Sequence, residues 1–313
     1  MEVIDTVARL REWVDGRRAD GESVGLVPTM GCLHDGHVGL LDRARGENDC
    51  VVMSVFVNPL QFRRGAYESY PRRLEDDLEI ARLGGVDVVF VPSVEEVYPA
   101  LGSLEEIFDL QDGSSGERDS DVFTVDCVGV DGGMEYVRVP GRLVMKMDGV
   151  DHPWHFDGVA TVVRLLFEMV GPGRAYFGQK DIQQVAILEA MNRWLKMGIE
   201  LVEVQVVRAD DGVSLSSRLM LLDDDQRAIA AAVVGLLECF AQDTTGQRVD
   251  GLVAKLMAGV DEIQTHRNML KIDSIDCVDP VSLERLDVMT ESAVVYIAYI
   301  INGIRLAETC WCG

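Results

Sequence analysis

The fold is decided by the stretch Val24–Arg45, which reads VGLVPTMGCLHDGHVGLLDRAR. The apolar run Val24–Val27 is typical of a buried strand, and the run from Val38 to Arg45 has the spacing of an amphipathic helix. His34 and His37 lie between these two segments, where a parallel sheet presents its functional residues. We therefore expect both imidazoles near the start of a helix, where backbone N–H groups and the helix dipole attract phosphate.

Gly36 separates the two histidines and has no side chain, which lets a flat base or a phosphate approach the backbone closely. The alternative is that one histidine caps the helix and the other is a buried polar group with its own partner. The strand before the motif and the helix after it favour a nucleotide site.

Length and composition limit the class of protein. With 313 residues, 48% of them hydrophobic, the chain is long enough for about two domains. It contains no run of eighteen apolar residues and no apolar segment near its start that is typical of a signal peptide. Seven cysteines without a CxxC pair fit a reducing compartment. We expect a globular cytoplasmic protein.

The charge of the chain is strongly negative. It has 29 basic and 53 acidic side chains, a formal net charge of −24. A field of this sign repels nucleic acid and anionic membranes, so neither is expected as a partner. It also repels ATP, so an anionic substrate needs a local cluster of cations and backbone N–H groups. Solubility or a salty cytoplasm explains the acidity more simply than a specific acidic function does.

Strand-like and helix-like segments alternate along the first two thirds of the chain. This alternation predicts an α/β fold, a Rossmann-like parallel sheet with helices on both faces. Strands are expected at 24–27, 50–57, 86–91, 175–177 and 201–207, and helices at 38–45, 71–83, 158–170, 179–197 and 223–240.

The pattern changes after about residue 208. This region predicts a smaller α+β domain, able to close over the first one. We therefore expect two domains, 1–207 and 208–313. In the second, helices are expected at 223–240 and 249–260 and strands at 272–278 and 294–301.

Polar residues follow three further predicted strands. Asn58 and Gln61 follow one strand, and Gly178–Asp181 follows another, with Gln183–Gln184 on the helix after it. The third leads to Ser214–Arg218, whose hydroxyls and guanidinium suit a polyphosphate. Each segment alone is equally typical of a turn, a helix start or a solvated loop. Their recurrence at successive strand ends indicates one shared site.

In this order, the motifs resemble the pantoate–β-alanine ligase family, a member of the His-x-Gly-His nucleotidyltransferase superfamily. The resemblance implies an ATP-dependent condensation of pantoate with β-alanine through a pantoyl adenylate, with release of AMP and pyrophosphate. It also implies small-molecule substrates only and a homodimer. The matching segments are 27–37, 51–62, 70–99, 155–188 and 206–218.

The resemblance assigns roles to individual residues. The catalytic residues are expected to be His37, His34 and Lys180, and the pantoate and β-alanine ligands Gln61, Gln184 and Asn58. The expected ATP contacts are Met30, Gly31, His34, His37, Gly178, Gln179, Lys180, Asp181, Val207, Leu215, Ser216, Ser217 and Arg218.

Magnesium is the expected cofactor, because a cation must neutralise the phosphates of ATP in this chemistry. Asp76, in the acidic run Glu75–Asp77, is the first candidate ligand. Acidic residues are also favoured at helix starts by the helix dipole, so a structural role is an equal alternative.

Several positions depart from the family pattern. His152 and Trp154 stand in a segment that usually reads Arg-Pro-x-His-Phe, and Leu219 replaces an asparagine. The family's Arg-Leu-Ile-Asp-Asn-like ending is only faintly echoed by Arg305–Glu308. These departures leave two alternatives open: a catalytically silent nucleotide-binding relative, and another nucleotidyltransferase of the superfamily. The paired glutamines and the loop that begins at Asn58 favour the ligase.

The stretch at about 100–150 is longer than in the family. A loop is expected at 112–117, followed by strands at 122–130 and 134–139 that turn at Gly132–Gly133. We expect a solvated insertion, with a lid or a dimer element as the alternatives.

Overall fold

The computed structural model describes residues 1–112, 118, 121–242, 244–266 and 269–312. Most of the loop expected at 112–117 therefore lies outside the described residues. The chain forms two compact units, which we call unit 1 and unit 2. Unit 1 comprises Met1–Leu33, His37–Gly178 and Gln183–Val204, and unit 2 comprises His34–Gly36, Gln179–Ile182 and Gln205–Gly313.

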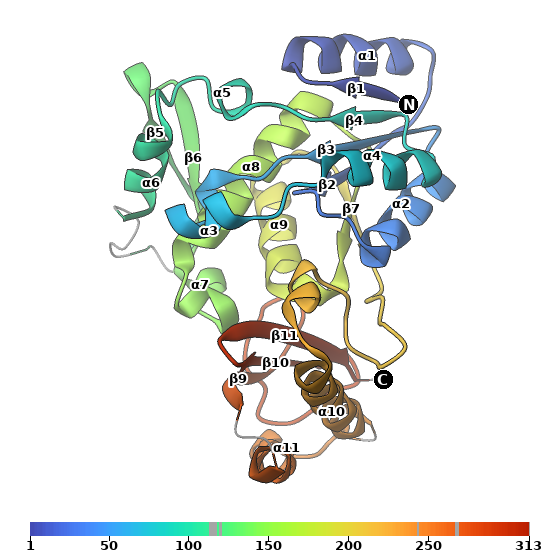
Figure 1. The fold of residues 1–313 in the computed structure, drawn as a ribbon. Coiled ribbons are helices and arrows are strands. Elements are labelled where there is room, and N and C mark those ends of the chain that lie inside the picture. The colour runs from blue at the N-terminus through green and yellow to red at the C-terminus, as the bar shows by residue number, and fades with distance from the viewer. Residues whose placement is uncertain (113–117, 119–120, 243, 267–268, 313) are drawn as a thin grey trace. The chain divides into compact units, whose positions relative to one another are not determined.

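Unit 1 is built on a six-stranded sheet in the order β1-β4-β3-β2-β7-β8 (Figure 1). Every pairing in it is parallel, which confirms the predicted Rossmann-like sheet. The edge strand β1 was not expected, because three residues carry too little periodicity to be recognised. The strands are β1 Glu2–Ile4, β2 Val24–Thr29, β3 Cys50–Val55, β4 Val88–Phe90, β7 Arg174–Gly178 and β8 Glu200–Val204.

Helices cover both faces of this sheet. On one face, Leu41 and Ala44 of α2 and Ala81 of α4 pack against Val51 and Met53. Helices α1 and α8 pack on each other and on β2. They lie on the opposite face because right-handed crossovers reverse direction at β2. The helices are α1 Val7–Ala19, α2 Asp35–Glu47, α3 Arg64–Ser69, α4 Leu74–Leu83, α5 Val94–Val97, α6 Leu104–Asp112, α7 Gly141–Val144, α8 Pro153–Val170 and α9 Ile182–Leu195.

The hairpin within the stretch 100–150 belongs to unit 1, and its second strand is buried there, so the expectation of a solvated insertion is wrong for that strand. Strands β5 Thr124–Val128 and β6 Met134–Arg138 pair antiparallel, as predicted. Strand β6 contacts α8, and the backbone N–H of Val137 donates to the hydroxyl of Thr161 at 2.9 Å. The sequence pattern predicts these short strands but does not indicate that β6 packs on the long apolar helix α8.

Asp157 of α8 anchors the same region. Arg118 donates to both of its carboxylate oxygens at 2.7 Å, and the N–H of Val139 donates to it at 2.9 Å. The turn of the hairpin is longer than the expected Gly132–Gly133 pair, because β5 ends at Val128 and β6 begins at Met134. Gly129, Asp131 and Gly132 in this turn adopt left-handed backbone angles.

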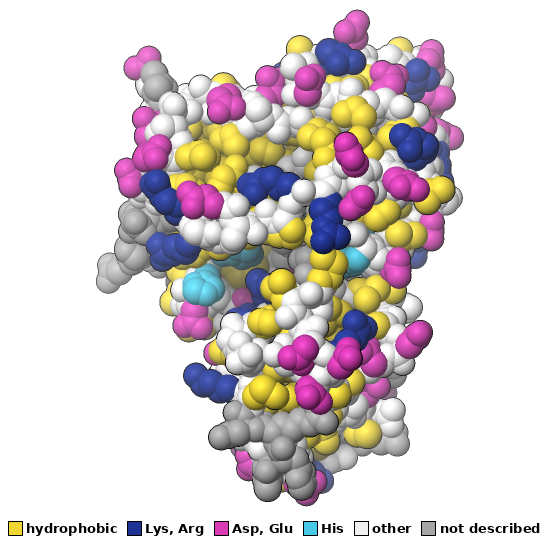
Figure 2. Space-filling view, viewed as in Figure 1, with side chains coloured by type: hydrophobic (Ala, Val, Ile, Leu, Met, Phe, Trp, Pro, Cys, Tyr) yellow, Lys and Arg dark blue, Asp and Glu magenta, His cyan; other side chains and the backbone are white. Residues whose placement is uncertain are grey.

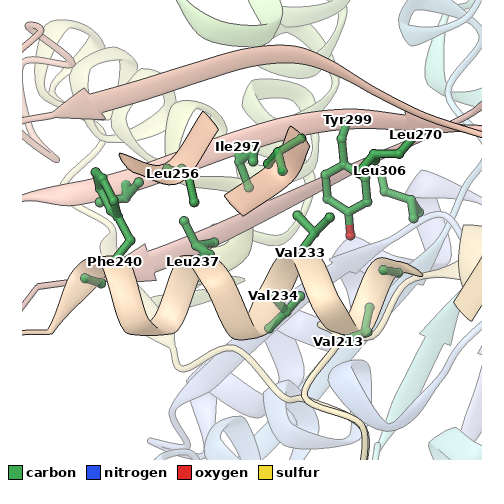
Figure 3. Packing of buried hydrophobic residues seen from close by; sticks show 14 of the residues in the cluster. Val213, Val233, Val234, Leu237, Phe240, Leu256, Leu270, Ile297, Tyr299 and Leu306 are labelled. Atoms are coloured by element: carbon green, nitrogen blue, oxygen red, sulfur yellow. The ribbon is translucent and has the colours of Figure 1, made fainter. Parts of the chain in front are cut away.

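Unit 2 contains the smaller α+β fold that was predicted. Its antiparallel sheet has the order β11-β10-β9, and α10 and α11 pack on it. In Figure 3, Leu237 and Phe240 of α10 point toward the sheet, where Ile297 and Tyr299 of β10 lie. Strand β11 was not predicted. The elements are α10 Asp224–Ala241, α11 Val249–His266, β9 Leu270–Val278, β10 Val294–Ile301 and β11 Ile304–Trp311.

None of the helices in the described part of the chain is both long and apolar enough to cross a membrane. Asp and Glu side chains are scattered over the face drawn in Figure 2.

Candidate active site

The loop that joins β2 to α2 is bent by two consecutive left-handed residues, Gly31 (φ 78°) and Cys32 (φ 54°). A Cβ atom at position 31 would lie 2.7 Å from a carboxylate oxygen of Asp77, so glycine is required there. Asp77, only 2% exposed, accepts hydrogen bonds from the N–H groups of Cys32 at 3.0 Å and Leu33 at 2.7 Å. A buried carboxylate from α4 thus holds the backbone that leads into the histidine motif.

Asp76 and Asp77, neighbours in the acidic run Glu75–Asp77, have different surroundings. Asp77 uses both carboxylate oxygens on backbone N–H groups, whereas Asp76, the candidate metal ligand, is exposed. Within the described residues, no group of three or more His, Cys, Asp or Glu side chains is arranged to hold a metal ion.

His34 immediately precedes α2, which begins at Asp35. Its Nδ1 accepts a hydrogen bond from the N–H of Gly36 at 3.2 Å. Since a backbone N–H can only donate, the neutral ring carries its proton on Nε2. Nδ1 of His34 therefore caps the start of α2, as the alternative interpretation expected, while Nε2–H remains able to donate a hydrogen bond.

The protonation state of His34 follows from its surroundings. Burial, and then the positive charge of Lys180, lower the pKa of His34 from 6.5 to about 4. The imidazole is therefore neutral at pH 7. Gly36 is explained by the same ring, because a Cβ atom at position 36 would lie 2.8 Å from Cε1 of His34. Gly36 thus leaves room for the imidazole of His34, whereas the sequence analysis explained this glycine by the close approach of a ligand.

Lys180 lies in the 3₁₀ turn Gln179–Asp181, between β7 and α9. Its carbonyl oxygen accepts a hydrogen bond from the hydroxyl of Thr309 at 2.8 Å. Gly178 ends β7, and a Cβ atom there would meet no atom within 4 Å. The backbone at the end of this strand is therefore open to a close approach.

The serine-rich loop Ser214–Arg218 is held by hydrogen bonds to other parts of unit 2. The carbonyl of Val207 accepts from the N–H of Leu215 at 3.0 Å, and Arg218 donates to the carbonyl of Arg305 at 3.1 Å. Ser216 is half-buried. The side chain of Ser217 lies outside the described residues.

Leu219 follows this loop and is 6% exposed, within the core of unit 2. The resemblance predicts an asparagine amide at this position, whereas this chain buries a hydrophobic side chain. Leu219 thus anchors the end of the loop by packing in the core of unit 2.

Asn58 and Gln61 lie close together in unit 1. Asn58 is 1% exposed; its Nδ2 donates to Oε1 of Gln61 at 2.8 Å and to the carbonyl of Gly158 at 3.0 Å. Its Oδ1 accepts from the hydroxyl of Tyr98 at 2.6 Å. Both ends of the Asn58 amide are thus engaged by the protein. His155 donates from Nδ1 to the carbonyl of Gln61 at 3.0 Å, so the backbone of Gln61 is held as well.

The paired glutamines on α9 differ in their contacts. Gln183 is buried; its Nε2 donates to the carbonyls of Leu143 and Lys146 at 3.0 and 2.7 Å, and its Oε1 accepts from the N–H of Gly149 at 3.2 Å. It therefore fastens the segment 143–149 to α9. Gln184 is half-buried.

A guanidinium lies beside the segment His152–Phe156. His152 is exposed and precedes α8, and Trp154 is buried in its first turn. The guanidinium of Arg63 lies 4.9 Å from the centre of the Trp154 ring. The cation beside this segment is therefore Arg63, which lies far earlier in the sequence, and not a residue at position 152.

Sequence reasoning missed three residues that organise these segments. Asp77 was considered only as part of an acidic run, Glu308 only as the end of a faint motif, and Thr309 not at all. The single available signal was the echo of the family ending at Arg305–Glu308. Their partners lie far away in the sequence, so no local pattern indicates them.

The fold and these segments define an α/β protein with a Rossmann-like sheet, a His-x-Gly-His element at the carboxyl end of β2, and polar segments after β3, β7 and β8. Within that class the chain belongs to the pantoate–β-alanine ligase family. The model of this family, described as pantoate-beta-alanine ligase, matches residues 2–311.

Individual relatives agree with this assignment. The chain is 36% identical over 310 residues to the pantothenate synthetase of Acetivibrio thermocellus, covering 98% of each chain. It is 38% identical over 296 residues to that of Corynebacterium glutamicum, covering 92% of each.

Solved structures agree as well. Pantothenate synthetase from Thermus thermophilus matches with a TM-score of 0.79 and 36% identity, over 100% of this chain and 99% of that one. The pantoate–β-alanine ligase of Francisella tularensis, solved in complex with beta-gamma ATP and β-alanine, matches with a TM-score of 0.70 and 25% identity, over 99% and 97% of the two chains.

Proposed function

We propose that this protein is an ATP-dependent pantoate–β-alanine ligase. The observation that carries the proposal is the family match over residues 2–311, together with the retained polar segments at the strand ends. A carboxylate oxygen of pantoate attacks the α-phosphorus of ATP, and the bond to the leaving pyrophosphate breaks. The amine of β-alanine then attacks the carbonyl carbon of the pantoyl adenylate, losing a proton and releasing AMP. Activation is needed because a free carboxylate does not react with amines.

In this proposal, unit 2 supplies donors to the phosphates. His34 is neutral, and its Nε2–H donates a hydrogen bond, while the ammonium group of Lys180 supplies positive charge. His37, at the start of α2, is proposed as their catalytic partner. The other proposed ATP contacts are Met30, Gly31, Gly178, Gln179, Asp181, Val207, Leu215, Ser216, Ser217 and Arg218.

Amides are proposed to bind pantoate. Gln61 and Gln184 orient the carboxylate without neutralising it, whereas an arginine would stabilise the ground state more than the transition state. Since Asn58 already donates to Oε1 of Gln61, Gln61 donates to substrate from Nε2. Asn58 contributes by holding this amide in place.

Magnesium is proposed to enter with ATP and to neutralise the charge of its phosphates when bound. The described residues provide no ready-made metal site, which suits an ion held mainly by phosphate oxygens and water. The exposed carboxylate of Asp76 is the proposed protein ligand. A lid role for 208–313 over a nucleotide- and pantoate-binding domain 1–207, a cytoplasmic location and a homodimer remain predictions.

The deciding experiment mixes the purified protein with ATP, Mg²⁺ and pantoate, with and without β-alanine, and follows pyrophosphate and AMP. We expect pantoate-dependent pyrophosphate release in both mixtures and multiple turnovers of AMP only with β-alanine. If ATP binds but neither product forms, the protein is a silent nucleotide-binding relative. If pyrophosphate appears with a different acceptor and not with pantoate, it is another nucleotidyltransferase.

A further inference from the structure

We propose that Glu308 and Thr309, adjacent residues of β11, are positioning residues that hold the two phosphate-binding segments of unit 2, the turn at Lys180 and the loop Ser214–Arg218, in one geometry. This inference rests on the proposed function. It assigns a task to a strand that the sequence did not predict. All the groups involved belong to unit 2.

Thr309 acts on the lysine turn. Its side chain is 1% exposed, and its hydroxyl donates to the carbonyl oxygen of Lys180 at 2.8 Å. Strand β11 packs on this 3₁₀ turn. A buried hydroxyl bonded to the backbone of the lysine restricts where the side chain begins, and so limits the positions that its ammonium group can reach.

Glu308 acts on the serine-rich loop. It is also 1% exposed; one carboxylate oxygen accepts from the N–H of Ser214 at 3.0 Å, and the other accepts from Arg208 at 3.0 Å. Neighbouring side chains of a strand point to opposite faces. A single strand can therefore restrain one segment through Glu308 and a second segment through Thr309.

The free edge of β11 holds the loop at both ends. Arg208, before the loop, donates to the carbonyl of Thr309 at 3.0 Å, and Arg218, at its end, donates to the carbonyl of Arg305 at 3.1 Å. In the order β11-β10-β9, one edge of β11 is paired with β10, and the other edge is paired with no strand among the described residues. Its edge carbonyls are therefore used to fasten the loop.

The central test compares Thr309→Val, which removes the hydroxyl at nearly constant volume, with Thr309→Ser, which keeps it. We expect Thr309→Val to lower kcat/KM for ATP by about tenfold to 100-fold, as misplaced catalytic groups do, and to leave KM for pantoate unchanged. Thr309→Ser should retain the wild-type values. If Thr309 had only a structural role, Thr309→Val would lower the melting temperature without a selective effect on the kinetics of ATP relative to those of pantoate.

Glu308→Gln tests the loop, with Glu238→Gln as its matched control. Glu238 also contacts Arg208, at 3.6 Å, but its side chain is well exposed, so its removal should have little effect. Glu308→Gln should lower kcat/KM for ATP in the same direction as Thr309→Val. Should Glu308→Gln fail to fold, as judged by circular dichroism, the two Thr309 variants decide the matter.

A readout independent of turnover is the NMR titration of His34, whose pKa is lowered partly by Lys180. Displacement of the lysine turn should raise this pKa in Thr309→Val and not in Thr309→Ser. Equal ATP kinetics and equal His34 titrations in all folded variants would overturn the inference. If the wild-type protein forms no AMP, the proposed function fails, and the His34 titration with calorimetric ATP binding still tests the positioning.

Discussion

The carboxylate of Asp77 lies 2.7 Å from the backbone nitrogen of Leu33, although 44 positions separate the two residues. Together with its second bond, to Cys32 at 3.0 Å, this contact links α4 to the loop before the histidines. The left-handed Cys32 is stabilised by it, since such a backbone costs about 1–2 kcal/mol for a residue other than glycine.

Asp77→Asn should therefore weaken both folding and ATP binding. The introduced NH₂ group faces a backbone N–H that needs an acceptor, which should destabilise the protein by roughly 1–3 kcal/mol and raise KM for ATP. Urea unfolding and steady-state kinetics measure the two effects. Glu79→Gln, an exposed position on the same helix, is the control; an Asp77→Asn variant that matches it would contradict this role.

The neutral state of His34 predicts a specific pH dependence. Because its pKa is lowered from 6.5 to about 4 in the folded protein, the unfolded chain binds the proton more tightly between these values. Stability should therefore fall as the pH drops from about 6.5 toward 4. Compared with wild type, His34→Gln should lose less unfolding free energy between pH 7 and pH 5, measured by urea titration.

Lys180→Met should raise the pKa of His34, because it removes one of the two causes that lower this pKa. The pKa should stay below 6.5, since burial, the larger cause, remains. NMR titration of the assigned imidazole measures it. An unchanged midpoint in a folded variant would show that the charge of Lys180 does not act on this ring.

Gln61→Ala and Gln184→Ala should each cripple adenylate formation while leaving the fold intact. The Gln183→Ala variant should behave differently, since Gln183 makes three hydrogen bonds to the segment 143–149. It should lose stability, by about 1–3 kcal/mol if buried groups remain unpaired. Pantoate-dependent pyrophosphate release and melting temperature separate the two behaviours. Near-normal turnover in Gln61→Ala or Gln184→Ala would reject their assignment.

Removal of magnesium with EDTA should abolish pyrophosphate release, and added Mg²⁺ should restore it. Asp76→Asn should raise the Mg²⁺ concentration needed for half-maximal rate by several-fold at most, because phosphate oxygens supply most ligands. The rate is measured across a magnesium titration. A complete loss of activity that magnesium cannot restore would mean that Asp76 has another role.

Much of the fold was predictable because strands and helices leave local periodicities in the sequence. The strands beginning at Val24 and Cys50 were expected within two residues of their ends. The helix expected to begin at position 158 starts earlier, at Pro153, since proline is accepted in a first helical turn. Strand β11 was missed because its mixed residues show no regular alternation.

The sequence by itself determined the alternation of the main strands and helices of the parallel sheet, the family, and the candidate residues, because these depend on spacing between near neighbours. Only the tertiary structure decided which of two adjacent glutamines is structural, which of two adjacent aspartates holds the loop, and what Thr309 contacts. Hydrogen-bond partners 34 to 129 positions apart are chosen by packing, and no local pattern records that choice.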